Sequence, residues 1–356
     1  MCGEIDKTFL IAGPCSAESE HQILTTIKAI IELDIKLNYF RAGIWKPRTR
    51  PNSFEGVGTK GLKWLQKAKE LYNIPVCVEV ATTVHVEESL KYGIDALWLG
   101  ARTTSNPIII QEIANSLKGV DIPIFVKNPI NPDIELWLGA FERLCNSGIT
   151  KLCAIHRGFS SHETNAYRND PIWEIPMKLK RIIPDLPLIC DPSHITGNSE
   201  MIFSISQRSL DFLFDGLMIE VHVNPTMALT DKKQQLAPRQ LKDLLNQLIP
   251  KNASTKNSNY LLKIETLRRD IDKFDKKLVE ILANRLEISK QIGSLKDKNR
   301  VAQYQPTRWE NVIEANMKYG KSLGVSSKLI KKMYQCIHEE SLEEQTPDRN
   351  GSINIL

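Results

Sequence analysis

The chain has 356 residues, of which 42% are apolar and 25% charged, and its formal net charge is +5. This composition suffices for one large domain and a smaller one. The small positive excess, with no long basic run, argues against a nucleic-acid-binding protein. No stretch approaches the ~20 apolar residues that span a bilayer, and the first residues lack a signal-peptide pattern, so we expect no membrane partner. The seven cysteines are odd in number and contain no CxxC pair, which predicts reduced thiols in the cytoplasm.

From Thr8 to about Leu248, short apolar runs alternate with amphipathic segments that have helical spacing. Continuously apolar strands separated by helices indicate a parallel sheet covered on both faces. Eight such units fit a (β/α)₈ TIM barrel, and an open doubly wound sheet fits the pattern as well. The eight runs are Phe9–Ala12, Leu37–Phe40, Pro75–Val78, Ala96–Leu99, Pro123–Val126, Leu152–Ile155, Leu188–Cys190 and Gly216–Ile219.

Every run leads into polar or ionisable residues. In a barrel these strand ends share one rim, where active sites are built from several strands. Polar residues at one or two strand ends need no function, but their presence at all eight predicts a site. The residues are Gly13–Ser16, Arg41 with Lys46, Glu79, Gly100–Arg102, Lys127, His156 with Arg157, Asp191–His194 and Glu220–His222.

The loop after the second run carries Lys46, Arg48 and Arg50, stiffened by Pro47 and Pro51. Because proline fixes φ, the cations are presented with little freedom, which suits a small, highly charged anion such as a phosphate. A solvated basic loop is the alternative interpretation.

The C-terminal part has a different pattern. Residues 250–259 are polar and predict a linker between a barrel domain, residues 1–249, and a helical domain, residues 260–345; residues 346–356 form a tail. Apolar residues at helical spacing predict one helix from Tyr260 to about Lys298, roughly 58 Å long. Two further helices are expected, from near Pro306 and from about Ser326 to Glu344. No compact small domain covers the long helix alone, so we expect a homodimer through the helical domain.

The barrel motifs resemble those of the 3-deoxy-D-arabino-heptulosonate 7-phosphate (DAHP) synthases, in particular the short type I beta-like form. The resemblance covers about residues 5–250 and implies condensation of phosphoenolpyruvate with erythrose 4-phosphate, the first step of the shikimate pathway. The motifs are Gly13-Pro-Cys15-Ser16, Lys46-Pro-Arg-Thr49, Gly100-Ala101-Arg102, His194 in Asp-Pro-Ser-His, Glu220-Val-His222, and Asp231 in Ala-Leu-Thr-Asp.

The resemblance implies that Cys15, His194, Glu220 and Asp231 bind one divalent metal ion. A thiolate, an imidazole and two carboxylates form a mixed set that suits Mn²⁺, the first choice, or Fe²⁺, Co²⁺ or Zn²⁺. Without the resemblance, Cys15 could equally be a buried thiol and His194 a hydrogen-bonded core residue.

The resemblance also implies the residues around the substrates. Lys46, Lys127 and Glu79 are the catalytic candidates, with Glu79 ordering a water, orienting the cations or serving only as their counter-ion. Arg48 and Thr49 would hold erythrose 4-phosphate. The residues around phosphoenolpyruvate would be Arg41, Lys46, Ala101, Arg102, Lys127 and Arg157.

Residues 260–345 resemble an all-helical chorismate mutase, which implies rearrangement of chorismate to prephenate. Arg308, Lys296 and Gln345 would be catalytic. Fixed cations and amide donors can hold the folded substrate and stabilise charge on its ether oxygen. The substrate-binding residues would be Arg268, which reaches into the partner chain's site, Arg285 and Ser341. The alternative is a dimerising bundle with a solvated basic face.

This second resemblance has departures. Family members often carry Arg-Glu where this chain has Arg308-Trp309, and an acidic residue where it has Gln305. We therefore expect weak mutase activity, with a pseudo-enzyme regulatory domain as the alternative.

Two further expectations concern the whole chain. Because the first strand is expected from Thr8, the usual place of a regulatory extension is empty, and we expect the helical domain to regulate the barrel with prephenate as effector. The alternative function is a 3-deoxy-octulosonate 8-phosphate synthase-like barrel, which uses arabinose 5-phosphate, with a non-catalytic helical domain. A non-enzymatic alternative is a barrel that only senses sugar phosphates. Such a barrel would not require ligand-type residues at all four metal positions, yet this chain has one at each.

Overall fold

The computed structural model describes residues 9–46, 54–160 and 166–345. The chain divides into two compact units, Met1–Ala253 and Ser254–Leu356.

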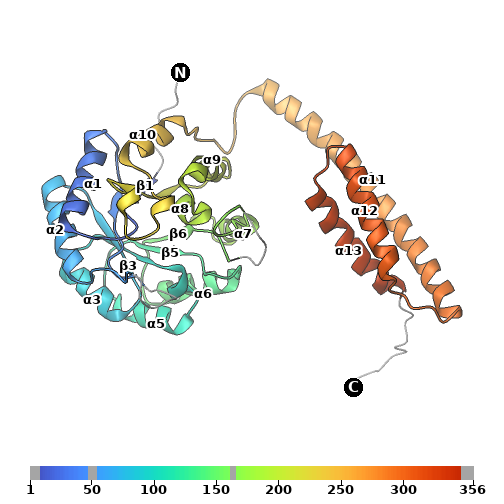
Figure 1. Ribbon diagram of the computed structural model, residues 1–356, viewed down its shortest axis with the longest axis horizontal. Coiled ribbons are helices and arrows are strands. Elements are labelled where there is room, and N and C mark those ends of the chain that lie inside the picture. Colours follow the sequence, from blue (N-terminus) through green and yellow to red (C-terminus); the bar gives the residue numbers. More distant parts are fainter. Residues whose placement is uncertain (1–8, 47–53, 161–165, 346–356) are drawn as a thin grey trace. The chain divides into compact units, whose positions relative to one another are not determined.

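The first unit is a closed barrel of eight parallel strands arranged in chain order (Figure 1). The last strand pairs with the first along its whole length, from Phe9 opposite Gly216 to Gly13 opposite Glu220. The predicted TIM barrel is therefore confirmed, and the open sheet is wrong. The strands are β1 Phe9–Gly13, β2 Tyr39–Arg41, β3 Val76–Val80, β4 Ala96–Leu99, β5 Ile124–Lys127, β6 Leu152–His156, β7 Leu188–Cys190 and β8 Gly216–Glu220.

The helices of this unit surround the barrel (Figure 1). Several begin at a side-chain cap, for example Ser19, Thr82 and Asp133, whose oxygens accept from the first free backbone N–H groups. The helices are α1 Glu20–Glu32, α2 Lys60–Tyr72, α3 Thr83–Lys91, α4 Ala101–Thr104, α5 Pro107–Ser116, α6 Ile134–Asn146, α7 Glu174–Ile182, α8 Pro192–Thr196, α9 Ile202–Asp211 and α10 Pro238–Gln247, with 3₁₀ turns η1 Ser199–Met201, η2 Pro225–Met227 and η3 Lys232–Gln234.

The barrel has two apolar layers, one between strands and helices and one inside the strands. Both faces of each strand are thus buried, which explains why the strands appear in the sequence as continuous apolar runs rather than alternating ones. The inner layer consists of Ile11, Cys77, Ala96, Trp98, Phe125, Cys153, Ile155, Ile189 and Met218.

The second strand differs from its prediction. It spans Tyr39–Arg41 rather than Leu37–Phe40, because Asn38 uses both its backbone and its side chain to bond Leu10 at the strand entrance. Arg41 can end a buried strand because its guanidinium pairs with Glu220 at 3.2 Å. Among the described residues, no helix has the length and apolar content that crossing a membrane requires.

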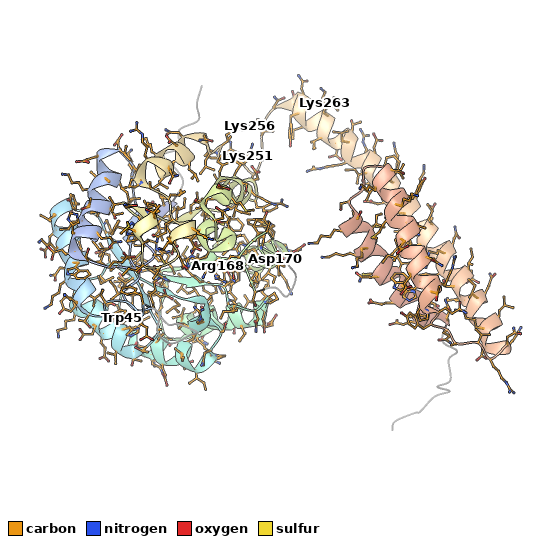
Figure 2. All side chains as sticks on the ribbon, viewed as in Figure 1. Trp45, Arg168, Asp170, Lys251, Lys256 and Lys263 are labelled. Atoms are coloured by element: carbon orange, nitrogen blue, oxygen red, sulfur yellow. The ribbon has the colours of Figure 1, made fainter. Side chains whose placement is uncertain are left out.

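The second unit is a bundle of three helices, α11 Ser258–Lys298, α12 Pro306–Ser322 and α13 Ser327–Gln345. The long helix begins two residues before the predicted Tyr260, so the linker is shorter than expected, because Asn257 caps it by accepting from the Tyr260 N–H. Lys251 and Lys256 lie in the connection that precedes it (Figure 2). α13 packs closely on both other helices; a Cβ added at Gly293 would lie 2.6 Å from Cα of Gln345.

Candidate functional site

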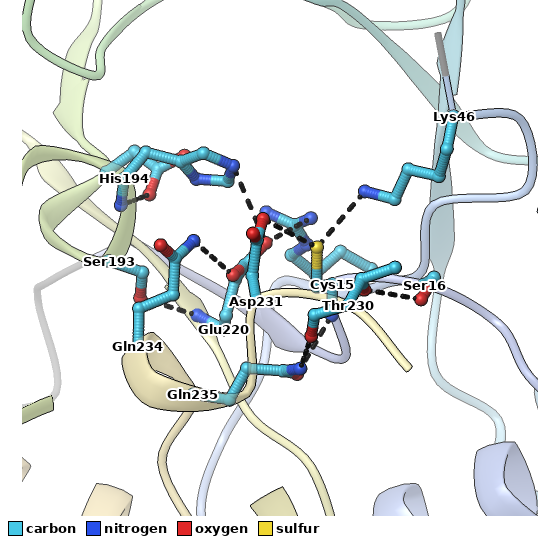
Figure 3. Close-up of polar contacts among 12 residues, drawn as sticks. Cys15, Ser16, Lys46, Ser193, His194, Glu220, Thr230, Asp231, Gln234 and Gln235 are labelled. Atoms are coloured by element: carbon cyan, nitrogen blue, oxygen red, sulfur yellow. Dashed lines mark hydrogen bonds and ion pairs between the residues drawn. The ribbon is translucent and has the colours of Figure 1, made fainter. Parts of the chain in front are cut away.

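The candidate site lies at the carboxyl ends of the strands and is centred on Cys15, which follows β1. The thiol is 1% exposed. Its Sγ lies 3.3 Å from Oδ2 of Asp231, and Nζ of Lys46 lies 3.2 Å away on the other side. Figure 3 shows Lys46 and His194 reaching toward this pair from opposite sides.

Two carboxylates complete a tight group around the thiol. One ligand atom each from Cys15, Glu220 and Asp231 can be chosen so that all lie within 4.8 Å of one another. Glu220 is the last residue of β8 and is fully buried, whereas Asp231 lies in the loop beyond it with φ of 46°. Residues 216 positions apart in the chain are thereby in contact.

His194, the fourth predicted ligand, lies at the edge of this group. Its Nε2 is 3.7 Å from Oε1 of Glu220, and its Nδ1 is 2.8 Å from Oδ2 of Asp191. A carboxylate beside one ring nitrogen fixes the imidazole and leaves the other nitrogen to face a ligand. Asp191 also accepts from Lys127 at 2.7 Å and from the His194 N–H, which caps α8.

These residues fit a divalent transition metal. Sulfur and carboxylate donors converge from the loop after β1, from β8 and from the loop after β8, with the imidazole of His194 in α8 at their edge. Cys15 and Glu220 are buried where an isolated anion is costly. Burial, followed by the charge of Glu220, raises the pKa of the Cys15 thiol to about 12. Burial also acts to raise the pKa of Glu220, but His194 and Arg41 outweigh it and hold the pKa below its ordinary value. A cation would compensate these charges.

A layer of cations lies beside the group. Arg41 donates to Glu220, and its guanidinium lies 4.8 Å from the ring centre of Trp98. Nζ of Lys127 lies 6.0 Å from the same ring. Trp98 is fully buried, and its ring attracts both cations by cation–π interaction.

Arg157 extends this positive region. Its Nη1 donates to Asn169 at 2.8 Å, and its backbone N–H donates to Asn128 at 2.7 Å. Burial lowers the pKa of Arg157 to about 10; Asp191 opposes this, while Arg168 and Arg102 add to it. The region therefore carries a positive charge that an anionic ligand would relieve.

Glu79 ends close to the start of α4, which carries Ala101 and Arg102. A Cβ at Gly100 would lie 2.1 Å from Oε1 of Glu79, so this glycine leaves room for the carboxylate. Burial acts to lower the pKa of Lys46, but the charges of Cys15 and then Glu79 outweigh it and raise that pKa. Arg48 and Thr49, the predicted erythrose 4-phosphate ligands, lie outside the described residues.

A second set of contacts reaches the carboxylates from outside. Nη1 of Arg168 lies 3.0 Å from Oδ1 of Asp231 and donates to Gln234 at 2.7 Å (Figure 2 labels Arg168). The Gln234 amide in turn donates to Oε2 of Glu220 at 2.7 Å. Sequence reasoning missed Arg168 and Gln234, which belong to no motif. Asp191 was named among the polar strand-end residues, within the Asp-Pro-Ser-His motif, but it was given no role of its own.

The helical unit contains a second polar cluster. Lys296 donates to Oε1 of Gln345 at 3.0 Å and to the carbonyl of Gln303 at 2.6 Å. Arg285 donates to the hydroxyl of Ser341. The structure thus brings together four of the six predicted residues, held by α11 and α13.

Among the described residues, no hydrogen bond or ion pair joins the other two to this cluster. Arg268 is 66% exposed and pairs with Glu265 at 3.9 Å. It precedes Arg285 by seventeen residues, about 26 Å along the helix. Arg308 lies in the first turns of α12 and is exposed.

Comparison with known proteins gives a match for each unit. Residues 1–256 match the DAHP synthetase I family, and residues 267–346 match chorismate mutase type II. The phospho-2-dehydro-3-deoxyheptonate aldolase of Thermotoga maritima is 31% identical over 239 residues, covering 67% of this chain and 68% of that protein. The 2-dehydro-3-deoxyphosphooctonate aldolase of Vesicomyosocius okutanii is 25% identical over 280 residues, covering 71% and 94%.

Solved structures agree. The crystal structure of the Thermotoga maritima DAHP synthase superposes with a TM-score of 0.59 at 31% identity, covering 67% of each chain. A truncated form of that synthase gives a TM-score of 0.56 at 29% identity, covering 67% of this chain and 84% of that one.

Proposed function

The chain belongs to the DAHP synthetase I family and continues into a chorismate mutase type II domain, and on that basis we propose which residues carry the two reactions. The barrel condenses phosphoenolpyruvate with erythrose 4-phosphate to DAHP and phosphate. The helical unit rearranges chorismate to prephenate. The 3-deoxy-octulosonate 8-phosphate alternative is weaker, because relatives with that type of name are 25% to 27% identical, against 31% for the heptonate enzyme.

The observation that carries the barrel proposal is the convergence of Cys15, Glu220 and Asp231 beside Lys46. These three ligands and His194 would hold one divalent cation, with Mn²⁺ as first choice and Fe²⁺, Co²⁺ or Zn²⁺ as alternatives. When bound, the cation supplies Lewis-acid polarisation of the substrate aldehyde.

The positive region around Arg157 suits phosphoenolpyruvate, a small molecule that carries both a phosphate and a carboxylate. Arg157, Arg102 and Lys127 would bind these anionic groups, since their mutual repulsion is relieved by a ligand of opposite charge. Arg41 would also face phosphoenolpyruvate, because only its Nη2 pairs with Glu220, while its buried Nε and Nη1 have no hydrogen-bond partner among the described residues. Ala101 would form part of the wall beside Arg102.

Lys46 is the ammonium group next to the proposed metal ligands and is positioned to give a proton to the aldehyde oxygen as carbon 3 of phosphoenolpyruvate attacks. Water then adds at carbon 2, and phosphate leaves. Glu79, close to Lys46 and Gly100, would orient that water or the cations. Arg48 and Thr49 would hold the phosphate and hydroxyl end of erythrose 4-phosphate.

The test is a coupled assay of the purified chain with phosphoenolpyruvate. Turnover with erythrose 4-phosphate and little with arabinose 5-phosphate supports the proposal. The reverse preference would assign the barrel to the octulosonate reaction.

For the mutase, the contacts of Lys296 with Gln345 and of Arg285 with Ser341 support a site on α11 and α13. Arg285 and Ser341 would bind carboxylates, while Lys296 and Gln345 would donate to the ether oxygen. Arg308 would complete the site and Arg268 would act in a partner's site. Measured conversion of chorismate, even if slow, supports this assignment; binding of prephenate without turnover would indicate a pseudo-enzyme regulatory domain.

The long helix also supports a dimer. α11 exposes a series of large apolar side chains, which a second copy would cover. The exposed residues include Leu267, Ile271, Phe274, Leu278, Ile281, Ile288 and Ile292. Light scattering should give twice the monomer mass, and a monomer at micromolar concentration would contradict this. The six cysteines that the structure describes are free thiols, and the need for a reduced Cys15 supports a cytoplasmic location.

Regulation by prephenate follows as a hypothesis from the fusion, since the mutase product is a later metabolite of the same pathway. Prephenate should inhibit the synthase reaction of the whole chain, and Lys296→Ala should weaken that inhibition by removing a cation of the binding site. An unchanged synthase rate at saturating prephenate would exclude the regulatory role.

A further inference from the structure

The face of α13 that carries Ser341 and Gln345 also carries His338. These residues are spaced by three and four positions, so they form one row along the helix. Ser341 and Gln345 hold Arg285 and Lys296, and the same two cations contribute to lowering the pKa of His338, after burial, while Glu339 opposes them. His338 therefore lies at the wall of the proposed mutase site.

The imidazole of His338 is fixed by two aromatic rings. Trp309 stacks on it with ring centres 4.1 Å apart and planes 10° apart, and Tyr304 lies 5.8 Å away on a tilted plane. Trp309 directly follows Arg308, at the position where the resembling mutases often carry glutamate. Trp309 and the imidazole stacked on it therefore occupy a place where many of the resembling mutases have an acidic side chain.

One nitrogen of this ring has no use in the structure. Nε2 of His338 is buried and has no hydrogen-bond partner among the described residues. A buried nitrogen without a partner is costly, and such a group in a native protein calls for a specific explanation, of which a ligand contact is one. A ring held in a stack cannot rotate freely to find water.

We propose that His338 is a further substrate-contacting residue of the mutase, and that its Nε2 bonds the ring hydroxyl of chorismate. The inference rests on the proposed mutase function. A hydroxyl group both donates and accepts, so it satisfies Nε2 in either neutral tautomer. Burial, followed by the charges of Arg285 and Lys296 from α11, opposes protonation of the ring, so the contact is a neutral hydrogen bond. Trp309 acts as a positioning residue that fixes the imidazole plane.

The experiment compares His338→Leu, which keeps helix propensity but removes the nitrogen, with His338→Gln, whose amide can donate and accept. The control Glu340→Leu changes an exposed residue of the same helix. We expect kcat/KM for chorismate to fall about five- to tenfold in the leucine variant, as for one lost neutral hydrogen bond, and to recover largely in the glutamine variant. Circular dichroism melts verify that each variant is folded.

A direct binding readout uses the ring nitrogens of His338 in ¹⁵N NMR of the full chain, assigned by the leucine variant, with prephenate as the probe. The Nε2 resonance should shift as prephenate saturates the wild type. A leucine variant with wild-type kcat/KM, or bound prephenate that leaves the resonance unmoved, overturns the inference while the mutase assignment stands. A wild type that neither converts chorismate nor binds prephenate overturns both.

Discussion

Oδ2 of Asp191 lies 2.8 Å from Nδ1 of His194, so Nε2 is the nitrogen left to face Glu220, 3.7 Å away. The carboxylate therefore orients the imidazole toward the thiol and carboxylates of the barrel rim. Asp191 is therefore a residue outside the proposed set of metal ligands that holds one of those ligands, His194, in position.

Asp191→Asn should weaken metal binding. The amide keeps the shape and the cap of α8 but removes the charge beside His194, so the affinity for Mn²⁺ should fall by roughly 10- to 100-fold. Competition with a fluorescent chelator measures this, with the exposed Asp185→Asn as control. Equal affinities of the variant and the control would exclude an orienting role for Asp191.

Arg168→Met tests the outer contacts of the site. Arg168 holds Asp231 at 3.0 Å and, through Gln234, also Glu220. If these contacts position the carboxylates, metal affinity should fall by about tenfold. Tighter metal binding in the variant would show instead that Arg168 acts chiefly as a competing cation; Arg239→Met, at an exposed position, controls for the loss of one charge.

His156 should make stability dependent on pH. Burial, followed by the charge of Arg157, lowers the pKa of this histidine to about 3 from an ordinary value of 6.5. Between these two values the unfolded chain binds more protons than the folded chain, so the contribution of His156 to the free energy of unfolding rises by about 1.4 kcal/mol per pH unit. This contribution is fully present above pH 6.5 and is lost as the pH falls toward the folded pKa.

The variant His156→Phe isolates this contribution. Its aromatic ring suits the surrounding Phe159, Trp173 and Phe214, and it cannot titrate. Urea unfolding between pH 5 and pH 7 should show a shallower pH slope than in the wild type. Parallel slopes would mean that His156 does not remain neutral in the folded chain.

Lys296→Ala should separate the two activities. Lys296 lies on α11 and contacts Gln345, whereas the proposed synthase residues lie at the barrel rim. Loss of a fixed donor to a developing charge should cost roughly 100-fold or more in mutase kcat, with the synthase rate unchanged in the absence of prephenate. Lys290 lies on the same helix as Lys296, and its substitution Lys290→Ala removes a surface ion pair with Glu344 of α13. This control variant should leave both activities unchanged. Parallel loss of both activities in folded Lys296→Ala would indicate one composite site.

The barrel could be predicted from the sequence because its signals are local. Each unit has a short apolar run followed by a polar residue, and these units recur along the chain. Examples are the run Ala96–Leu99 and, in the next unit, the run that ends at Lys127. The three-helix unit could also be predicted from the sequence. The helical spacing of apolar residues indicates its helices, Pro306 marks the start of the second helix, and the polar linker separates the unit from the barrel. The incorrect prediction was local too: the strand expected from Leu37 starts at Tyr39, after Asn38 bonds Leu10 through its backbone N–H and its side-chain oxygen.

The site could be predicted only in part. Motifs named the ligands, but no spacing in the sequence reveals that Cys15 meets Asp231 or that Arg168 reaches the same carboxylate. Such contacts depend on how separate loops meet above the closed barrel. The stack of Trp309 on His338 is of the same kind, since the two residues lie on different helices.

Metal content, measured together with synthase activity in the wild type and in Cys15→Ala, tests whether the barrel reaction depends on a metal held by Cys15. We expect one divalent ion per wild-type chain, loss of DAHP formation on chelation and its recovery with added Mn²⁺. The Cys15→Ala protein should be folded, bind metal weakly and form no DAHP. Full DAHP formation by a metal-free wild-type preparation would contradict this dependence on metal.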